Sequence, residues 1–120
     1  MRRYAGQNRR RDACFCADGE LEDPVGTPIR CGRDEIQEYW ARGLCAVAAA
    51  VEIHVLAVLP AGGSVAGHWR MTARSRAGLV AHAEGIDVLS LDEAGLIRRA
   101  EGYWDQAGFR DALEQQTASN

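Results

Sequence analysis

The sequence contains no lysine, so all fourteen of its basic residues are arginine. It also contains no long apolar run: the longest, LCAVAAAV at residues 44–51, is too short to span a membrane as a helix. Five arginines lie within the first eleven residues, but no apolar segment follows them, so we predict no signal peptide. We expect a cytoplasmic protein with no membrane partner and with a solvated or frayed N-terminus.

Metal sites and nucleic-acid surfaces are not predicted either. The net charge of −3 and the isoelectric point of about 5.6 provide no overall field that would attract a nucleic acid. The cysteines lack the paired spacing of zinc ligands and the histidines are scattered: Cys14, Cys16, Cys31 and Cys45, and His54, His68 and His82. We therefore expect reduced cysteines that pack in the core, no metal and no organic cofactor.

The length of 120 residues and a hydrophobic content of 47% predict one domain spanning residues 1–120, with a frayed tail at 115–120. Period-two alternation predicts strands at 52–59, 64–75, 79–92 and 96–105, joined by turns at PAGG, RAG and EAG. A helix is predicted at 33–44, a short helix or strand at 109–113, and a short helical or irregular segment before residue 33. Helices followed by consecutive antiparallel strands indicate an α+β domain, with helices covering one face of a curved sheet.

The segment predicted to be helical, RDEIQEYWARGL at residues 33–44, is amphipathic. Ile36, Tyr39, Trp40 and Leu44 fall on one face at helical spacing. Two acids, Asp34 and Glu35, lie in the first turn, where the helix dipole favours negative charge. We expect this face to pack against the sheet.

One acid, Asp87, lies within the long strand predicted at residues 79–92. Alternation places it either on the apolar face that carries Ala83 and Leu89, or pointing to water if Ile86 and Val88 face inward. The pattern does not decide between these two arrangements. On the apolar face, burial would raise the pKa of the Asp87 carboxyl, and a protonated acid can donate a hydrogen bond to a developing oxyanion.

A second acid, Asp23, precedes a proline in the segment LEDPVG at residues 21–26. The residue before a proline is held in extended geometry, and Pro24 fixes its own φ, so Asp23 sits on a stiff segment. Such a segment suits a positioned proton-transfer group, and Glu22 is expected to point the opposite way. A simple turn-capping aspartate explains the same pattern.

Two segments together resemble the ketosteroid isomerases of the NTF2-like, or SnoaL-like, superfamily. FCADGELEDPVGTPIRCGRDEIQEYW carries the Ala-Asp turn, the acid-Asp-Pro-x-Gly segment and the Gly-Arg-acid-x-Ile helix start of that family. GIDVLSLDEAGLIRRAEGYWD carries the Ile-Asp-Val strand, the Gly-x-Ile turn and the Tyr-Trp pair. The resemblance covers residues 15–105. It implies a cone formed by a curved antiparallel sheet packed on N-terminal helices, which are shortened here.

The resemblance also implies a chemistry for the two acids. Asp23 matches the general base that moves a proton from C4 to C6 of a Δ5-3-ketosteroid, and Asp87 matches the protonated acid that donates to the dienolate oxygen. The steroid-like apolar substrate is expected to contact Trp40, Trp69, Met71 and Trp104. Proteins of this superfamily commonly form homodimers, so a homodimer is expected.

The sequence departs from the family pattern at its start. The family places an oxyanion-hole tyrosine on a helix ahead of the Asp-Pro segment, but here only Tyr4 precedes Asp23, within a shortened or frayed segment at residues 1–14. Tyr4 is therefore the candidate for that donor. Two alternatives remain: a non-catalytic NTF2-like module that binds an apolar small molecule or a protein, and a related cyclase, dehydratase or epoxide hydrolase. The outward positions of His68 and Arg70 argue against the related enzymes.

Overall fold

The computed structural model describes residues 2–3 and 12–114 of the chain. The strands are β1 (Arg2–Arg3), β2 (Phe15–Glu22), β3 (Arg30–Cys31), β4 (Ala50–Ala61), β5 (Ser64–Arg74), β6 (Val80–Leu91) and β7 (Ile97–Tyr103). The helices are α1 (Arg33–Arg42), α2 (Leu44–Val47) and α3 (Gln106–Glu114). The α+β class is confirmed, and the undecided segment near residues 109–113 is a helix.

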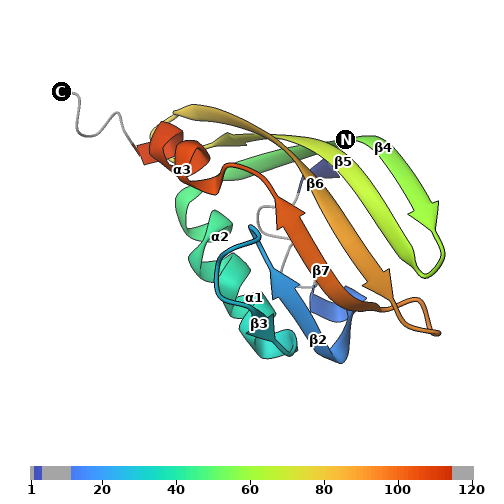
Figure 1. Cartoon of the computed structure of the whole chain (residues 1–120). Coiled ribbons are helices and arrows are strands. Elements are labelled where there is room, and N and C mark those ends of the chain that lie inside the picture. Colours follow the sequence, from blue (N-terminus) through green and yellow to red (C-terminus); the bar gives the residue numbers. More distant parts are fainter. Residues whose placement is uncertain (1, 4–11, 115–120) are drawn as a thin grey trace.

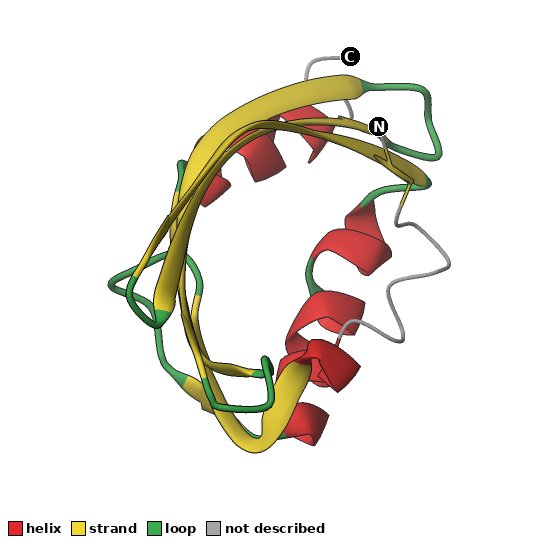
Figure 2. Cartoon of the chain, turned by 90° about the vertical axis from the view of Figure 1, so that its right-hand side faces the viewer, coloured by secondary structure: helices red, strands yellow, loops and turns green. Residues whose placement is uncertain are grey.

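All seven strands belong to one sheet, in the order β1-β4-β5-β6-β7-β2-β3. The strands from β4 to β7 form an antiparallel meander, as predicted from their alternation. The sheet is long, strongly curved and twisted (Figure 1), and the helices lie on its concave side (Figure 2). The turns after β5 and β6 contain Gly78 and Gly95 with positive φ, a conformation that glycine adopts without steric cost.

The prediction of a helical or irregular segment before residue 33 was wrong for residues 15–22, which form strand β2. This strand runs parallel to β7, so the sheet is mixed and not wholly antiparallel. Its sequence, FCADGELE, contains residues that are poor strand formers, and its register with β7 shifts between Phe15 and Glu20. A β-carbon at Gly19 would lie 3.0 Å from the carbonyl oxygen of Ile97, so β2 approaches β7 closely only because a glycine stands there.

The predicted helix at 33–44 is confirmed, but α1 ends at Arg42, two residues earlier than predicted, and a second helix starts at Leu44. The N–H of Gly43 donates to the carbonyl of Tyr39 at the end of α1, and the short α2 follows. At the start of α1, Glu35 accepts a hydrogen bond from the N–H of Cys31, 2.9 Å away, which satisfies a donor just ahead of the helix. The predicted apolar face packs inward, with Ile36 and Trp40 buried.

Two hydrophobic clusters hold the helices on the sheet. One joins the α1 face to strands β2 and β7 through Phe15, Leu21, Ile36, Trp40 and Ala100. The other joins α3 to strands β4, β5 and β6 around Val51, Met71, Ala81, Phe109 and Leu113. The space between the clusters, on the concave face, is where the cavity described below lies. In the described part of the chain, no helix has the length and apolar character needed to cross a bilayer.

Candidate active site

A largely apolar cavity of about 310 Å³ opens on the concave face of the sheet. Its wall is formed mainly by side chains of β4, β5, β6, α2 and α3, among them Val47, Ile53, Val65, Leu89 and Phe109. Only a few polar groups reach it, and two of them are the carboxyl groups of Asp23 and Asp87. A cavity of this size and character suits an apolar small molecule that is oriented by a small number of polar contacts.

The structure decides the orientation of Asp87, which the alternation pattern left open. Asp87 lines the cavity and is half-buried, whereas Ile86, the neighbouring residue, is 46% exposed on the other face of the sheet. A row of paired residues crosses the sheet at this level: Val58 opposite Gly67, Gly67 opposite Asp87, and Asp87 opposite Gly102. Because both cross-strand neighbours of Asp87 are glycines, neither has a side chain to fill the space beside its carboxyl group.

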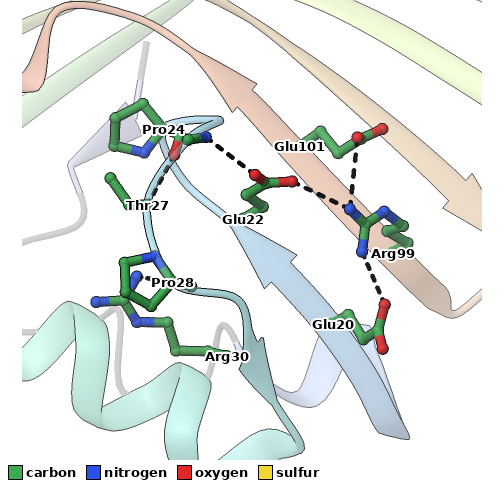
Figure 3. Close-up of polar contacts among 9 residues, drawn as sticks. Glu20, Glu22, Pro24, Thr27, Pro28, Arg30, Arg99 and Glu101 are labelled. Atoms are coloured by element: carbon green, nitrogen blue, oxygen red, sulfur yellow. Dashed lines mark hydrogen bonds and ion pairs between the residues drawn. The ribbon is translucent and has the colours of Figure 1, made fainter.

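The turn that follows β2 carries Asp23. Its peptide bond to Pro24 is cis, and the N–H of Val25 donates to the carbonyl of Gly102 on β7 at 2.7 Å. Glu22 points away from Asp23, as predicted. One of its carboxyl oxygens accepts from the N–H of Gly26 at 2.9 Å, so the Glu22 side chain spans the turn (Figure 3).

Arg99 of strand β7 also holds this turn in place, through ion pairs with nearby acids. The other carboxyl oxygen of Glu22 lies 3.1 Å from Arg99, whose guanidinium also pairs with Glu20 at 2.7 Å and Glu101 at 3.6 Å (Figure 3). The hydrogen bond to Glu20, followed by the charges of the nearby acids, raises the pKa of Arg99. The arginine therefore ties the end of β2 to β7, immediately beside Asp23.

Gly102 brings the two acids of the cavity together. A β-carbon built at this glycine would collide with Oδ1 of Asp23 and would lie 3.2 Å from Oδ1 of Asp87. Both oxygens therefore lie within a few ångströms of one point, the place on β7 where a side chain would begin at residue 102. The segment LEDPVG and the strand GIDVL, some sixty residues apart in the sequence, meet here.

An indole N–H holds the carboxyl group of Asp23. Trp104 Nε1 donates to Asp23 Oδ1 at 2.7 Å. The Trp104 ring is fixed in turn by edge contacts with Trp69 and Phe109, each with ring centroids 5.6 Å apart. The contact with Asp23 is charge-assisted when the carboxyl group is ionised, so it favours the ionised form and one rotamer.

A tyrosine contacts the same acid from helix α1. The hydroxyl of Tyr39 donates to the backbone carbonyl of Asp23, accepts from Gln106 Nε2 at 2.8 Å, and lies 3.4 Å from Oδ2 of Asp23. Burial, and then the charge of Asp23, raise the pKa of Tyr39 well above its usual range. The hydroxyl group therefore stays protonated at neutral pH and remains a donor. Residues of α1, α3 and the β2 turn are joined by this chain of contacts.

The side chains predicted from the resemblance to contact substrate all line the cavity: Trp40, Trp69, Met71 and Trp104. Their roles stay predictions. Tyr4, the predicted third donor, lies outside the described residues.

His68 and Arg70 contact Glu84 on the convex face, at 2.8 and 3.8 Å, although atoms of His68 also reach the cavity wall. Within residues 2–3 and 12–114, no group of three or more histidine, cysteine or acidic side chains is arranged to hold a metal ion.

Three residues of the site were not found from the sequence: Tyr39, Gln106 and Gly102. Tyr39 was placed on the packing face of its helix, and that periodicity gives no sign of a contact with Asp23. Gln106 begins a helix whose start was not predicted. The role of Gly102 depends on the register that places it opposite Asp87, and the pairing of β7 with β2 was not predicted either.

Residues 5–100 match the SnoaL-like domain. A curated steroid Delta-isomerase from Nocardioides simplex is 33% identical over 93 residues, which cover 77% of this chain and 72% of that protein. RV0760c from Mycobacterium tuberculosis, solved in complex with estradiol-17beta-hemisuccinate, is 18% identical with a TM-score of 0.69 and covers 86% of this chain and 92% of its own.

A computationally designed 17-OHP binder has a similar structure, with 16% identity and a TM-score of 0.72, over 86% of this chain and 85% of the designed chain. At these identities the two solved structures establish a shared fold. The expected NTF2-like architecture is thereby confirmed, with the parallel pairing of β2 and β7 as its mixed element.

Proposed function

The chain belongs to the SnoaL-like family, and from this premise we propose that it is a Δ5-3-ketosteroid isomerase-like enzyme that transfers a proton within its substrate. The observation that carries the proposal is the meeting of Asp23 and Asp87 in one apolar cavity, next to Gly102. The identity with a steroid Delta-isomerase over most of the chain supports the substrate class.

The proposed mechanism assigns opposite protonation states to the two acids. Asp23 is ionised, because the N–H of Trp104 donates to it, and it takes the proton from C4 of the substrate. The electrons of that bond enter a dienolate whose negative charge lies on the 3-oxygen. Asp87 is protonated and donates a hydrogen bond to that oxygen. Asp23 then returns its proton to C6, which moves the double bond into conjugation with the ketone.

The closeness of the two acids supports opposite protonation states for Asp23 and Asp87. Two carboxyl groups that share an apolar site do not both ionise readily, because like charges repel and burial disfavours each charge. The indole N–H of Trp104 donates to Asp23 and stabilises its ionised form, so we assign the negative charge to Asp23 and the proton to Asp87.

The test is a turnover assay with 5-androstene-3,17-dione, followed by the ultraviolet absorbance of the conjugated enone. We expect the protein to accelerate the conversion over buffer and the Asp23→Asn variant to lose about a hundredfold to ten-thousandfold in kcat. Asp34→Asn is the matched control, because this exposed aspartate in the first turn of α1 lies outside the cavity. No conversion above buffer, or equal rates in the protein and in Asp23→Asn, would exclude the proposal.

A second candidate function is ligand binding without turnover, and the open edge of the cavity favours it. Val55 and Val58 line the cavity on β4 yet are 66% and 55% exposed. A binding module would show a raised melting temperature with steroids while no enone is formed. The same assay therefore separates the two functions.

The homodimer and the cytoplasmic location stay predictions. The large apolar side chains exposed along β4 support the former, because an exposed apolar patch often marks a contact with another protein. Sedimentation equilibrium of the purified protein would test it.

A further inference from the structure

A second hollow, of about 500 Å³, adjoins the apolar cavity and has a different character. It lies between α1 and the start of α3, and charged side chains form most of its wall: Arg30, Glu35, Glu38, Arg42 and Arg110. Three residues, Tyr39, Gln106 and Arg110, line both this charged groove and the apolar cavity. The two hollows are therefore contiguous across these three side chains.

Most charges in the groove are already engaged within the protein. Arg42 pairs with Glu38 at 3.2 Å, one helical turn away. Glu35 accepts from the N–H of Cys31, and Arg30 donates to the carbonyl of Pro28 at 2.7 Å. The guanidinium of Arg30 also lies over the ring of Tyr39, 4.3 Å from its centroid.

Arg110 differs from these residues. It lies on α3, four residues after Gln106 and thus on the same helix face, and it is half-buried where the apolar cavity meets the groove. Within residues 12–114, no ion pair or hydrogen bond of its guanidinium is found. An arginine left without an acid at the boundary of an apolar cavity is suited to bind an anionic group of a ligand, because its planar fork matches the oxygens of a carboxylate or sulfate.

We propose that the physiological ligand carries an anionic substituent, which leaves the apolar cavity between α1 and α3 and pairs with Arg110. The inference rests on the proposed function for the apolar part of the ligand, a steroid-like ring system that occupies the cavity. It adds to that function a charge on a substituent of the ring system. The groove contains three arginines against two glutamates, so its net charge is positive and favours an anion.

The experiment compares ligands that share one steroid ring system and differ in the substituent at C17. Estradiol 17-hemisuccinate carries a carboxylate, estradiol 17-sulfate carries a sulfate, and the methyl ester of the hemisuccinate has nearly the same shape as the first without its charge. Dissociation constants are measured by calorimetry for the protein, for Arg110→Gln and for Arg98→Gln. Arg98 is the matched control: it is an exposed arginine of β7 outside both hollows, and its loss changes the net charge equally.

We expect the protein to bind at least one of the two anions about tenfold more tightly than the methyl ester. Arg110→Gln should reduce that preference to about one, whereas Arg98→Gln should retain it. The preference should also weaken as salt is added, since the pair is partly exposed.

Two results would overturn the inference alone: methyl ester binding with no preference for either anion, or a preference that survives in Arg110→Gln. If none of the three steroids binds, the steroid-like ligand class itself fails, and the inference fails with it. Binding of the neutral ester therefore distinguishes the two failures.

Discussion

The two sides of the cavity are built in different ways. On the side of β7, which we call the acid side and define by Asp23, Asp87, Gly102 and Trp104, short contacts hold the groups in place. On the side of β4, the edge side, defined by Val55, Val58 and Val65, apolar side chains line the cavity and the two from β4 are largely exposed. One cross-strand row connects the two sides, from Val58 through Gly67 and Asp87 to Gly102.

The difference separates two requirements of one site. Proton transfer depends on the position of a base within a fraction of an ångström, and hydrogen bonds supply that precision. Binding an apolar ring system depends on the apolar area removed from water. The exposed valines supply such area, and their contacts do not require precise positions. Substitutions on the acid side should therefore change kcat, and substitutions on the edge side should change KM.

Apart from the loss of Asp23 itself, the largest effect is expected from Gly102→Ala on the acid side. The new β-carbon would collide with Oδ1 of Asp23, so the carboxyl group must leave its position beside Asp87. We expect kcat to fall about a hundredfold, measured by enone formation, with a stability loss of about 1–3 kcal/mol measured by urea unfolding. Gly63→Ala is the control, because a β-carbon there would have its nearest neighbour 4.0 Å away and the residue lies outside the cavity. Equal kcat in both variants would contradict the role given to Gly102.

An intermediate effect is expected from Trp104→Phe. The change removes the N–H that donates to Asp23 and keeps an aromatic ring against Phe109. A hydrogen bond to a charged group contributes about 1.5–3 kcal/mol, so kcat/KM should fall about tenfold or more. The loss of a donor to the ionised form should also move the acid limb of the pH–rate profile to higher pH.

Trp69→Phe is the matched control for that experiment. The indole nitrogen of Trp69 is buried and has no hydrogen-bond partner in the described part of the chain, so its removal takes no contact from Asp23. Its ring packs against Trp104, so a change in KM is expected, but the acid limb should stay in place. If the acid limb of the pH–rate profile moved equally in Trp104→Phe and Trp69→Phe, the hydrogen bond from Trp104 to Asp23 would not be the cause of the shift.

The smallest effect is expected from Val58→Ser on the edge side. The valine is more than half exposed, so its loss should cost little stability. It removes apolar area from the cavity wall, which should raise KM about threefold and leave kcat unchanged. Val80→Ser serves as the control, because Val80 is also exposed but lies outside the cavity. A fall in kcat for Val58→Ser would contradict the claim that the edge side affects KM alone.

Local signals explain which parts of the fold were predictable from the sequence. Alternation and turn glycines specify β4 to β7, since each pairs with its neighbour along the chain. Strand β2 escaped prediction because it pairs in parallel with β7, from which it is separated by most of the chain, and its residues are weak strand formers. The same pairing brings the Asp23 turn beside Gly102.

The site was predictable only in part, for the same reason. The stiffness of the Asp-Pro segment and one possible face for Asp87 follow from local geometry. Their meeting was implied by the family resemblance, and local patterns did not predict it. The contacts of Tyr39 and Gln106 with the Asp23 turn depend on how α1 and α3 are placed against the sheet, which the sequence periodicity does not specify.

The central claim is that Asp87 is protonated at neutral pH while Asp23 is ionised. Infrared spectroscopy of the protein at pH 7 tests it without any substrate, because the C=O stretch of a protonated carboxyl group is separate from the carboxylate bands. The account predicts one such band, which is lost in Asp87→Asn and retained in the control Asp34→Asn. Absence of the band in the unmodified protein, or its persistence in Asp87→Asn, would contradict the account.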